Sequence, residues 1–202
     1  MANDAAFYND VYLTNPGKWA NGNTYRDARA FELVSKHINK PARILDFGCG
    51  NGHTLEYFHS YWSETEYTGV DISEVALRIA QWHMPDALFA TELPEEEWDV
   101  ILSLGVIEHF IDPEVQLRLL GRHLAPGGHM YIEEPDCLAY SEDKSEGFRV
   151  TNGGSGQKEW HWKRETWDNT IRKAGFVIEE YMDVPDDNKF IWVLRKDSDG
   201  SS

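Results

Sequence analysis

The segment over residues 43–53, R-I-L-D-F-G-C-G-N-G-H, constrains the fold of this chain more than any other part of it. A short apolar run that contains Asp46 leads directly into glycines at three alternate positions. This order predicts a buried strand, a tight turn and a helix that begins near His53 or Thr54. Because glycine has no Cβ, the backbone of such a turn can approach a ligand closely. The segment therefore predicts a loop that binds a nucleotide-like ligand.

The spacing of the three glycines, G-x-G-x-G, separates this loop from those that bind a pyrophosphate. A dinucleotide-binding loop follows G-x-G-x-x-G, and His53 occupies the position of its third glycine. The G-K-[S/T] sequence of a P-loop is also absent. Burying Asp46 as a charge would be costly unless its carboxylate received hydrogen bonds or faced a cation. We therefore expect a ligand with a positive or donor-rich end.

The segment 46–52, D-F-G-C-G-N-G, resembles motif I of the class I methyltransferases that use S-adenosylmethionine. Residues 69–73, 98–103 and 124–128 resemble further motifs of this family, in the family's order. The chain is similar to the small-molecule branch, with the ubiquinone-biosynthesis enzymes and the type 11, 12 and 23 methyltransferase domains. The resemblance implies an α/β fold, a Rossmann-like seven-stranded, mostly parallel sheet with helices on both faces and an antiparallel last strand.

The resemblance also implies which residues hold S-adenosylmethionine, with S-adenosylhomocysteine as the product. Asp46 and the glycine loop would hold the methionine end. Glu92 would accept a hydrogen bond from the adenine amino group, or it is a solvated acid in an acidic run. The predicted cofactor-binding residues are Asp46, Gly48, Cys49, Gly50, Gly52, Asp71, Ile72, Glu92, Leu93, Leu104, Gly105 and Val106.

Asp71 follows the glycine loop by about 20 residues, the spacing at which a carboxylate accepts hydrogen bonds from both hydroxyls of a ribose. The alternative is that Asp71 only caps the next helix. Ser73 suits that cap at least as well, since S-E-V-A opens the helix. We therefore expect Asp71 to bind the ribose.

Three residues are candidates for catalysis on the acceptor side of the site: His109, His161 and Glu134. His109 lies in V-I-E-H-F-I-D-P and could act as a base or orient the acceptor, or it could only shape the cofactor pocket. The carboxylates over residues 133–136 could hold a cationic acceptor, unless only one of them points inward. The predicted substrate residues are the aromatic side chains Tyr8, Tyr12, Trp19, Tyr25, Trp160 and Trp162, and the alternative is that these rings pack on the sheet.

No metal site is predicted. Relatives that act on ubiquinone precursors or on RNA ends hold a divalent ion with E-x-x-E-H, but Gly105 stands in place of the first glutamate here. Glu108 and His109 alone would make a poor site, and further ligands would have to come from elsewhere, such as Glu134 or His161.

Apolar patterning predicts the remaining elements. A helix is expected over 24–39, strands over 67–70, 87–91, 100–104, 129–133, 176–182 and 190–195, and a turn at 186–188. Residues 137–160 show no core-forming pattern, so a flexible span is expected there. The glycine-rich run before the Trp-His-Trp sequence of 160–162 indicates a lid over the substrate.

A length of 202 residues suits one α/β domain. The expected parts are an aromatic cap and helix (1–40), a methyltransferase core (41–196) with 137–163 as the lid insertion, and a disordered tail (197–202). A net charge of -16 disfavours nucleic acid and anionic membranes as partners. The chain has two cysteines, no signal-like start and no membrane-spanning run, which favours a cytoplasmic protein.

The sequence therefore predicts an enzyme that transfers a methyl group from S-adenosylmethionine to a small-molecule acceptor, at an oxygen or a nitrogen. The alternative is a methyltransferase-like module that binds the cofactor without turnover. A metal-dependent RNA-end methyltransferase and a nicotinamide oxidoreductase are less favoured. The acceptor and the oligomeric state do not follow from the sequence.

Overall fold

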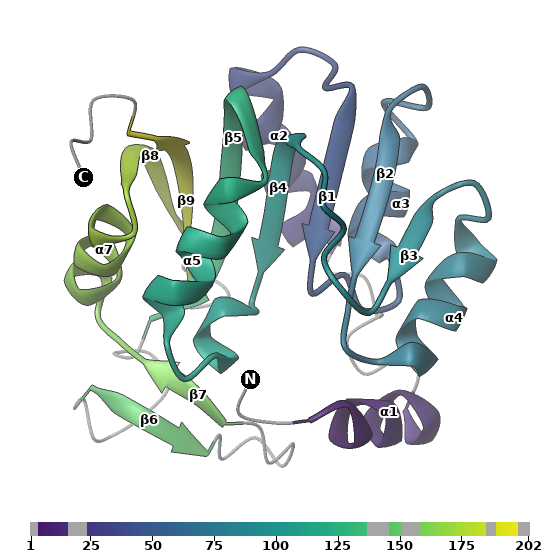
Figure 1. Ribbon diagram of the computed structural model, residues 1–202, viewed down its shortest axis with the longest axis horizontal. Helices are drawn as coiled ribbons and strands as arrows, with labels where there is room; N and C mark the ends of the chain where they lie inside the picture. Colours follow the sequence, from purple (N-terminus) through teal and green to yellow (C-terminus); the bar gives the residue numbers. More distant parts are fainter. Residues whose placement is uncertain (1–3, 16–23, 137–145, 151–157, 185–188, 198–202) are drawn as a thin grey trace.

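A seven-stranded sheet in the order β3-β2-β1-β4-β5-β9-β8 forms the centre of the computed structural model (Figure 1). The structure describes residues 4–15, 24–136, 146–150, 158–184 and 189–197. Four pairs, β1–β2, β1–β4, β2–β3 and β4–β5, are parallel, and β9 runs antiparallel to both β5 and β8. The strands are β1 Arg43–Phe47, β2 Glu66–Val70, β3 Leu88–Ala90, β4 Trp98–Leu104, β5 Leu124–Pro135, β8 Phe176–Val184 and β9 Lys189–Lys196. The mostly parallel sheet with an antiparallel last strand, predicted from the resemblance, is confirmed.

Helices cover both faces of this sheet, as predicted. Side chains of α2 and α3 pack on one face, and side chains of α5 and α7 pack on the other. Helix α4 lies along β3 at the edge, where α1 contacts it. The helices are α1 Ala5–Thr14, α2 Thr24–His37, α3 His53–His59, α4 Glu74–His83, α5 Pro113–Arg122 and α7 Arg164–Lys173, with a short 3₁₀ helix, η1, at Ile107–His109. In the described part of the chain, no helix is both long and apolar enough to cross a membrane.

Local sequence signals set the helix starts that border the site. The Ser73 hydroxyl accepts a hydrogen bond from the Ala76 amide at 3.2 Å and so caps α4. Asp112 caps α5 in the same way through the Val115 amide at 3.1 Å, and Pro113 follows at the first helical position. These caps fix where the loops after β2 and β4 end, which positions the residues that those loops carry.

A second, two-stranded sheet lies beyond the carboxyl ends of the parallel strands (Figure 1). It pairs β6 (Gly147–Val150) with β7 (Lys158–His161) in an antiparallel register, and β7 contacts η1. The expectation of no regular structure over 137–160 is therefore wrong for its described residues. Aromatic contact explains the difference, because the Phe148 and Trp160 rings lie 5.0 Å apart across the pair, a contact that alternation along one strand does not predict.

Three expectations concern parts of the chain outside the described residues. These are the turn at 186–188, the glycine-rich run over 151–157, and residues 198–202 of the tail expected over 197–202.

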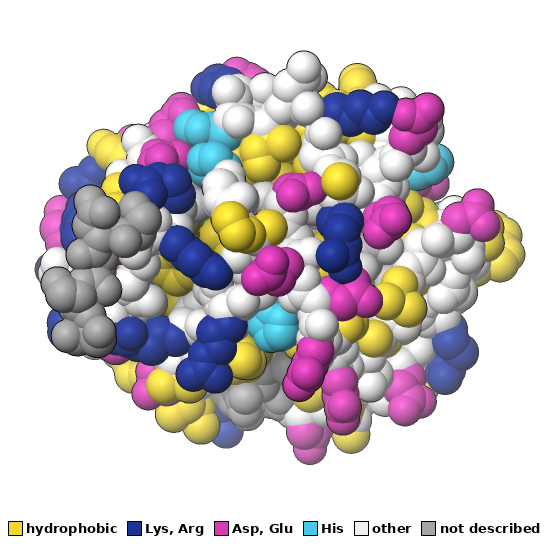
Figure 2. Space-filling model, turned by 45° about the horizontal axis from the view of Figure 1, so that its top comes forward, with side chains coloured by type: hydrophobic (Ala, Val, Ile, Leu, Met, Phe, Trp, Pro, Cys, Tyr) yellow, Lys and Arg dark blue, Asp and Glu magenta, His cyan; other side chains and the backbone are white. Residues whose placement is uncertain are grey.

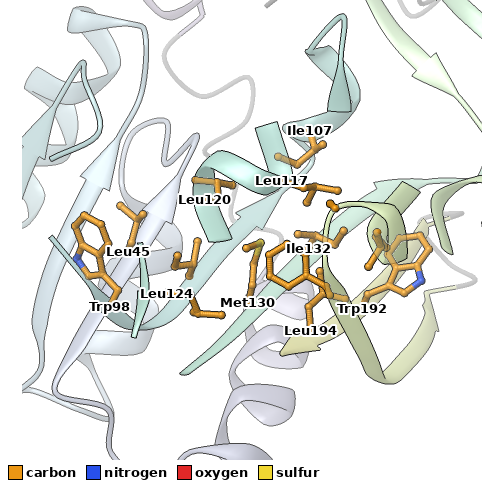
Figure 3. Close-up of a cluster of buried hydrophobic side chains, with 14 of the residues drawn as sticks. Leu45, Trp98, Ile107, Leu117, Leu120, Leu124, Met130, Ile132, Trp192 and Leu194 are labelled. Atoms are coloured by element: carbon orange, nitrogen blue, oxygen red, sulfur yellow. The ribbon is translucent and has the colours of Figure 1, made fainter. Parts of the chain in front are cut away.

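The core on the α5 and α7 side joins the elements that carry the site (Figure 3). Leu45 of β1, Ile132 of β5 and Trp192 of β9 meet Leu117 and Leu120 of α5 there. All five side chains are fully buried. Burial of this apolar surface holds the strand ends in register around the turns that follow β1 and β4.

Replacing Leu120 with alanine should lower the free energy of unfolding by about 2–5 kcal/mol, because the change leaves a cavity in this core. Val115→Ala is the matched control on the same helix, since Val115 is 60% exposed, and it should change that free energy by less than about 1 kcal/mol. Urea denaturation of the two variants measures both effects. Equal losses would contradict the assignment of these two faces of α5.

Candidate functional site

A cavity of about 570 Å³ opens at the carboxyl ends of β1, β2 and β4. The strand order reverses between β1 and β4, and the crevice at such a reversal is where open parallel sheets bind their ligands. The turns after these three strands form its floor. The walls come from distant parts of the chain: Tyr8 and Tyr12 of α1, Arg26 of α2, Glu159 of β7 and Lys189 of β9.

The turn after β1 is tightly enclosed. Gly48 has a φ of 81° and Gly50 a φ of 54°, values that side chains rarely tolerate. A Cβ at Gly48 would collide with the Val106 side chain, and one at Gly50 would collide with the Tyr12 hydroxyl. The turn therefore lies between the loop after β4 and helix α1.

Asp71, at the end of β2, joins this turn to α4. One carboxylate oxygen accepts a hydrogen bond from the Gly50 amide at 2.9 Å, and the other accepts from the Ser73 amide at 2.8 Å. Burial raises the pKa of Asp71, and these two hydrogen bonds lower it. A carboxylate has about four acceptor positions, so lone pairs remain for hydroxyl groups of a ligand in the cavity. Ser73, not Asp71, supplies the helix cap.

The glycine turn has a mixed cluster of charges beneath it. Asp46 is buried behind the cavity, and burial raises its pKa to about 7, an effect that the Arg26 guanidinium opposes and the charges of Asp27 and Asp71 increase. Arg26 lines the cavity, with its Nε 3.7 Å from an oxygen of Asp27. The Thr54 hydroxyl donates to the same oxygen at 3.0 Å. A guanidinium thus faces the cavity next to the glycine turn and can pair with an anionic group of a ligand.

The wall formed by η1 and β7 holds a histidine in a defined tautomer. The Nδ1 of His109 lies 2.9 Å from the carbonyl oxygen of Lys158, so this nitrogen carries the proton and donates it. Its Nε2 is then unprotonated in the neutral ring and lies 3.8 Å from a carboxylate oxygen of Glu108. Both residues line the cavity. This arrangement can accept a proton from a bound molecule and stabilise the imidazolium that forms.

Glu159 of β7 lies beside this pair, and burial raises its pKa to about 7, with a further increase from the charge of Glu108. Glu108, His109 and Glu159 each offer a ligand atom within 4.8 Å of the others, so together they could hold a divalent ion. The sequence predicts no metal site, and the further ligands it offers to Glu108 and His109 are Glu134 and His161 rather than Glu159.

The other two catalytic candidates lie behind this wall and do not line the cavity. Glu134 is fully buried and accepts a hydrogen bond from the Glu108 amide at 3.1 Å. Burial raises the pKa of Glu134 well above its usual range, and the charge of Glu108 raises it further. His161 contacts an oxygen of Glu159 at 3.1 Å through its Nε2. Both residues therefore contact a group of the wall rather than the space where an acceptor would bind.

The predicted substrate aromatics separate into two groups. Tyr8 and Tyr12 line the cavity, whereas Trp160 and Trp162 pack against the core on the α7 side. The Trp160 Nε1 donates to the Phe110 carbonyl at 2.9 Å. Packing against the core removes the two apolar indoles from water, which favours this direction over the cavity. Neighbouring residues of a strand point to opposite sides, so Glu159 lines the cavity instead.

The remaining substrate candidates lie elsewhere. Tyr25 is half-exposed on α2 with the Arg29 guanidinium over its ring, and it does not line the cavity. Trp19 lies outside the described residues.

Most of the predicted cofactor residues meet at the cavity. Its lining includes Gly48, Cys49, Gly50, Asp71, Ile72, Leu93, Leu104, Gly105 and Val106. Asp46 and Gly52 lie behind it, and Glu92 borders a separate shallow depression beside α4.

Sequence reasoning missed Arg26, Glu159 and Lys189. An arginine early in an amphipathic helix is usually solvated, so Arg26 gave no signal. Lys189 could have been found, because the first residue of an antiparallel neighbour lies at the carboxyl end of β5, where it pairs with Pro135. Its Nζ donates to a Glu133 oxygen at 2.7 Å.

Comparison with known proteins identifies relatives of this chain. A family model described as "Methyltransferase domain" matches residues 21–181. The trans-aconitate 2-methyltransferase of Methylobacterium radiotolerans is 30% identical over 131 residues, which are 62% of this chain and 50% of the relative. The ubiquinone biosynthesis O-methyltransferase of Mesorhizobium japonicum is 32% identical over 121 residues, 55% of this chain and 45% of the relative. The chain thus spans about half the length of the curated relatives it matches.

Among solved structures, the fold is similar to that of the 1,6-didemethyltoxoflavin-N1-methyltransferase of Burkholderia thailandensis, crystallised with 1,6-didemethyltoxoflavin and S-adenosylhomocysteine. The TM-score is 0.74 at 20% identity, with 95% of this chain and 86% of that chain covered.

The buried carboxyl of Asp46 should give the ligand-free protein a characteristic pH dependence. Its pKa is about 7 in the folded chain and about 3.9 in an unfolded one, so the folded state loses stability as the pH rises from 4 through 7. In the Asp46→Asn variant, residue 46 cannot ionise. The free energy of unfolding of this variant, minus that of the unsubstituted protein, should therefore increase from pH 4 to pH 7. Urea denaturation at a series of pH values measures the difference. Asp86→Asn, at an exposed aspartate, should give a flat difference, and a flat result for Asp46→Asn as well would refute the assignment.

Proposed function

Since this chain belongs to the methyltransferase domain family, whose model spans residues 21–181, we propose that it transfers a methyl group from S-adenosylmethionine to a small-molecule acceptor at an oxygen or a nitrogen. The observation that carries the proposal is Asp71, which lines the cavity while its carboxylate accepts from the amides of Gly50 and Ser73. A carboxylate fixed in this way, next to a glycine turn, suits a ribose better than a phosphate. Relatives named for trans-aconitate and for ubiquinone biosynthesis support a small-molecule acceptor.

The residues around the glycine turn would orient the cofactor. Asp71 would bind the two ribose hydroxyls, and the Arg26 guanidinium would pair with the carboxylate of the methionine part. Leu93, Leu104 and Val106 offer apolar walls for the adenine ring. When bound, the cofactor supplies a methyl group on a sulfonium, which is already a good leaving group. The protein therefore has to position the two reactants and manage the proton of the acceptor.

His109 would take that proton. Its Nδ1 hydrogen is held by the Lys158 carbonyl, so Nε2 is the free base, and Glu108 lies close enough to stabilise the positive ring. Glu134 and His161 would act through Glu108 and Glu159, as positioning residues. Tyr8 and Tyr12 would close the cavity from the α1 side.

The competing function is a methyltransferase-like module that binds the cofactor without turnover. We propose turnover because a histidine lines the cavity with its Nδ1 held by the Lys158 carbonyl, which leaves Nε2 to meet the acceptor. Formation of S-adenosylhomocysteine from S-adenosylmethionine in the presence of an acceptor separates the two functions. We further propose no stable association with nucleic acid, because the net charge of -16 repels phosphates. We also propose a cytoplasmic location, which suits a chain whose two cysteines lie far apart in the sequence.

A thermal-shift screen tests the cofactor and the acceptor class together. S-adenosylhomocysteine should raise the melting temperature, and small phenols, amines and carboxylic acids added on top of it should identify the acceptor by a further increase. If S-adenosylhomocysteine produces no shift, the proposed function is wrong.

Asp71→Ala should weaken S-adenosylhomocysteine binding at least about tenfold, because the ribose hydroxyls lose their acceptor and the glycine turn loses a hydrogen bond. His109→Ala should leave this affinity within about threefold but lower turnover by about 10²–10⁴, because it removes the base. Calorimetry and single-turnover assays measure the two quantities. Asp86→Ala is the control for an aspartate outside the cavity. Equal losses of cofactor affinity in the Asp71 and His109 variants would contradict this division of roles.

A further inference from the structure

A cluster of histidines and glutamates lies far from the cavity, at the end of the sheet where the parallel strands begin. His37 is the last residue of α2, His129 lies in β5 beside Val100 near the start of β4, and Glu179 lies in β8. Figure 2 shows this end of the molecule, with histidine side chains among acidic and basic ones. Three elements that are distant in the sequence thus bring their polar groups to one place.

The two ring nitrogens converge on one carboxylate oxygen. The Nε2 of His129 lies 2.9 Å from Oε2 of Glu179, and the Nδ1 of His37 lies 3.8 Å from the same oxygen. One ligand atom from each residue lies within 4.8 Å of those of the other two. In a tetrahedral zinc site with bonds of about 2.0–2.2 Å, neighbouring ligand atoms lie about 3.3 Å apart. Small side-chain adjustments would therefore enclose an ion.

A β-bulge in β8 explains why two successive glutamates face α2. Neighbouring residues of a regular strand point to opposite faces, but the register of β8 against β9 shifts between Ile178 and Glu180. As a result both Glu179 and Glu180 reach His37, with Glu180 at 3.2 Å from its Nε2. Bulges commonly re-aim side chains at functional sites.

Surrounding hydrogen bonds orient two of the three ligand side chains, His37 and Glu179. The Nε2 of His37 donates to Glu180, which leaves its Nδ1 lone pair directed at the cluster. The Nε of Arg195 donates to Oε1 of Glu179 at 2.9 Å, so Oε2 is the oxygen that faces the two histidines. A histidine held by a carboxylate on its far nitrogen is the usual support of a metal-binding imidazole.

Tyr131 supplies an independent observation. This side chain is fully buried, and its hydroxyl has no hydrogen-bond partner among the described residues. Its ring centroid lies 6.4 Å from those of both His37 and His129. A buried unpaired hydroxyl is costly, and a water molecule on a bound ion would give it a partner.

We propose that His37, His129 and Glu179 form a zinc-binding site, with a water molecule in the fourth position. Two imidazole nitrogens and one carboxylate oxygen are ligands that zinc prefers. The ion would fasten the end of α2 to β5 and β8. This inference does not depend on the proposed methyl transfer.

The test is a zinc titration of the metal-free full chain against a chromophoric chelator, with and without His37→Gln. His37 is partly exposed, so this change should preserve the fold. The native protein should bind zinc at least about tenfold more tightly at this site than the variant, and saturating zinc should raise its melting temperature by a few degrees more. Cobalt, which reports tetrahedral coordination by its visible absorption, should give that spectrum in the native protein and lose it in the variant.

Two control variants make the result specific. His53 and His83 flank Glu56 in a similar surface group, with nitrogen–oxygen distances of 3.5 and 3.9 Å, and His83→Gln should leave zinc affinity unchanged. Glu159→Gln removes a ligand of the group in the cavity and should leave the His37 site intact. Unchanged zinc binding in His37→Gln, or a loss of all zinc binding in Glu159→Gln, would overturn the proposal. His129→Gln, at a partly exposed position, should lose the site as well.

Discussion

The carboxylate of Asp71 is the interaction on which the site depends most. It ties the glycine turn after β1 to the start of α4 through the amides of Gly50 and Ser73, across the pair of parallel strands β1 and β2. Burial makes this charge costly, and the two amides offset part of the cost. Positions 48 and 50 require glycine, because both have a positive φ and because Val106 and Tyr12 leave no room for a Cβ. One charged group thus fixes the shape of the floor before any ligand binds.

The acceptor side is built on a different principle. Carboxylates of Glu108 and Glu159 line it, fully buried Glu134 lies behind it, and Lys189 is the cation that faces them, held by Glu133. Burial raises the pKa of Glu159 and Glu134, and the charge of Glu108 raises both further. A molecule that brings a positive or proton-donating group would relieve this repulsion. An acceptor that carries its own negative charge would have to approach Lys189.

The sheet and the cofactor half of the cavity could be predicted from the sequence because their signals are local. Asp46, the glycines and Asp71 lie at strand ends that short sequence patterns predict. Ser73 is a typical helix N-cap residue and marks the start of α4. The acceptor half could not be predicted in the same way. Glu159 arrives on a strand whose pairing depends on the contact between Phe148 and Trp160, and Lys189 arrives through the register of β9 on β5. Trp160 and Trp162 are predicted substrate residues because they are aromatic, but in the structure both side chains pack against the core.

The small β6–β7 sheet has a consequence for how the site could be controlled. Its backbone holds the proton of His109 on Nδ1 through the Lys158 carbonyl, and the same strand carries Glu159 into the cavity. Displacement of β7 would therefore remove an acidic wall and, at the same moment, release the ring to change tautomer or rotate. The orientation of the His109 ring and the acidic wall of the cavity are therefore both held by one strand, β7.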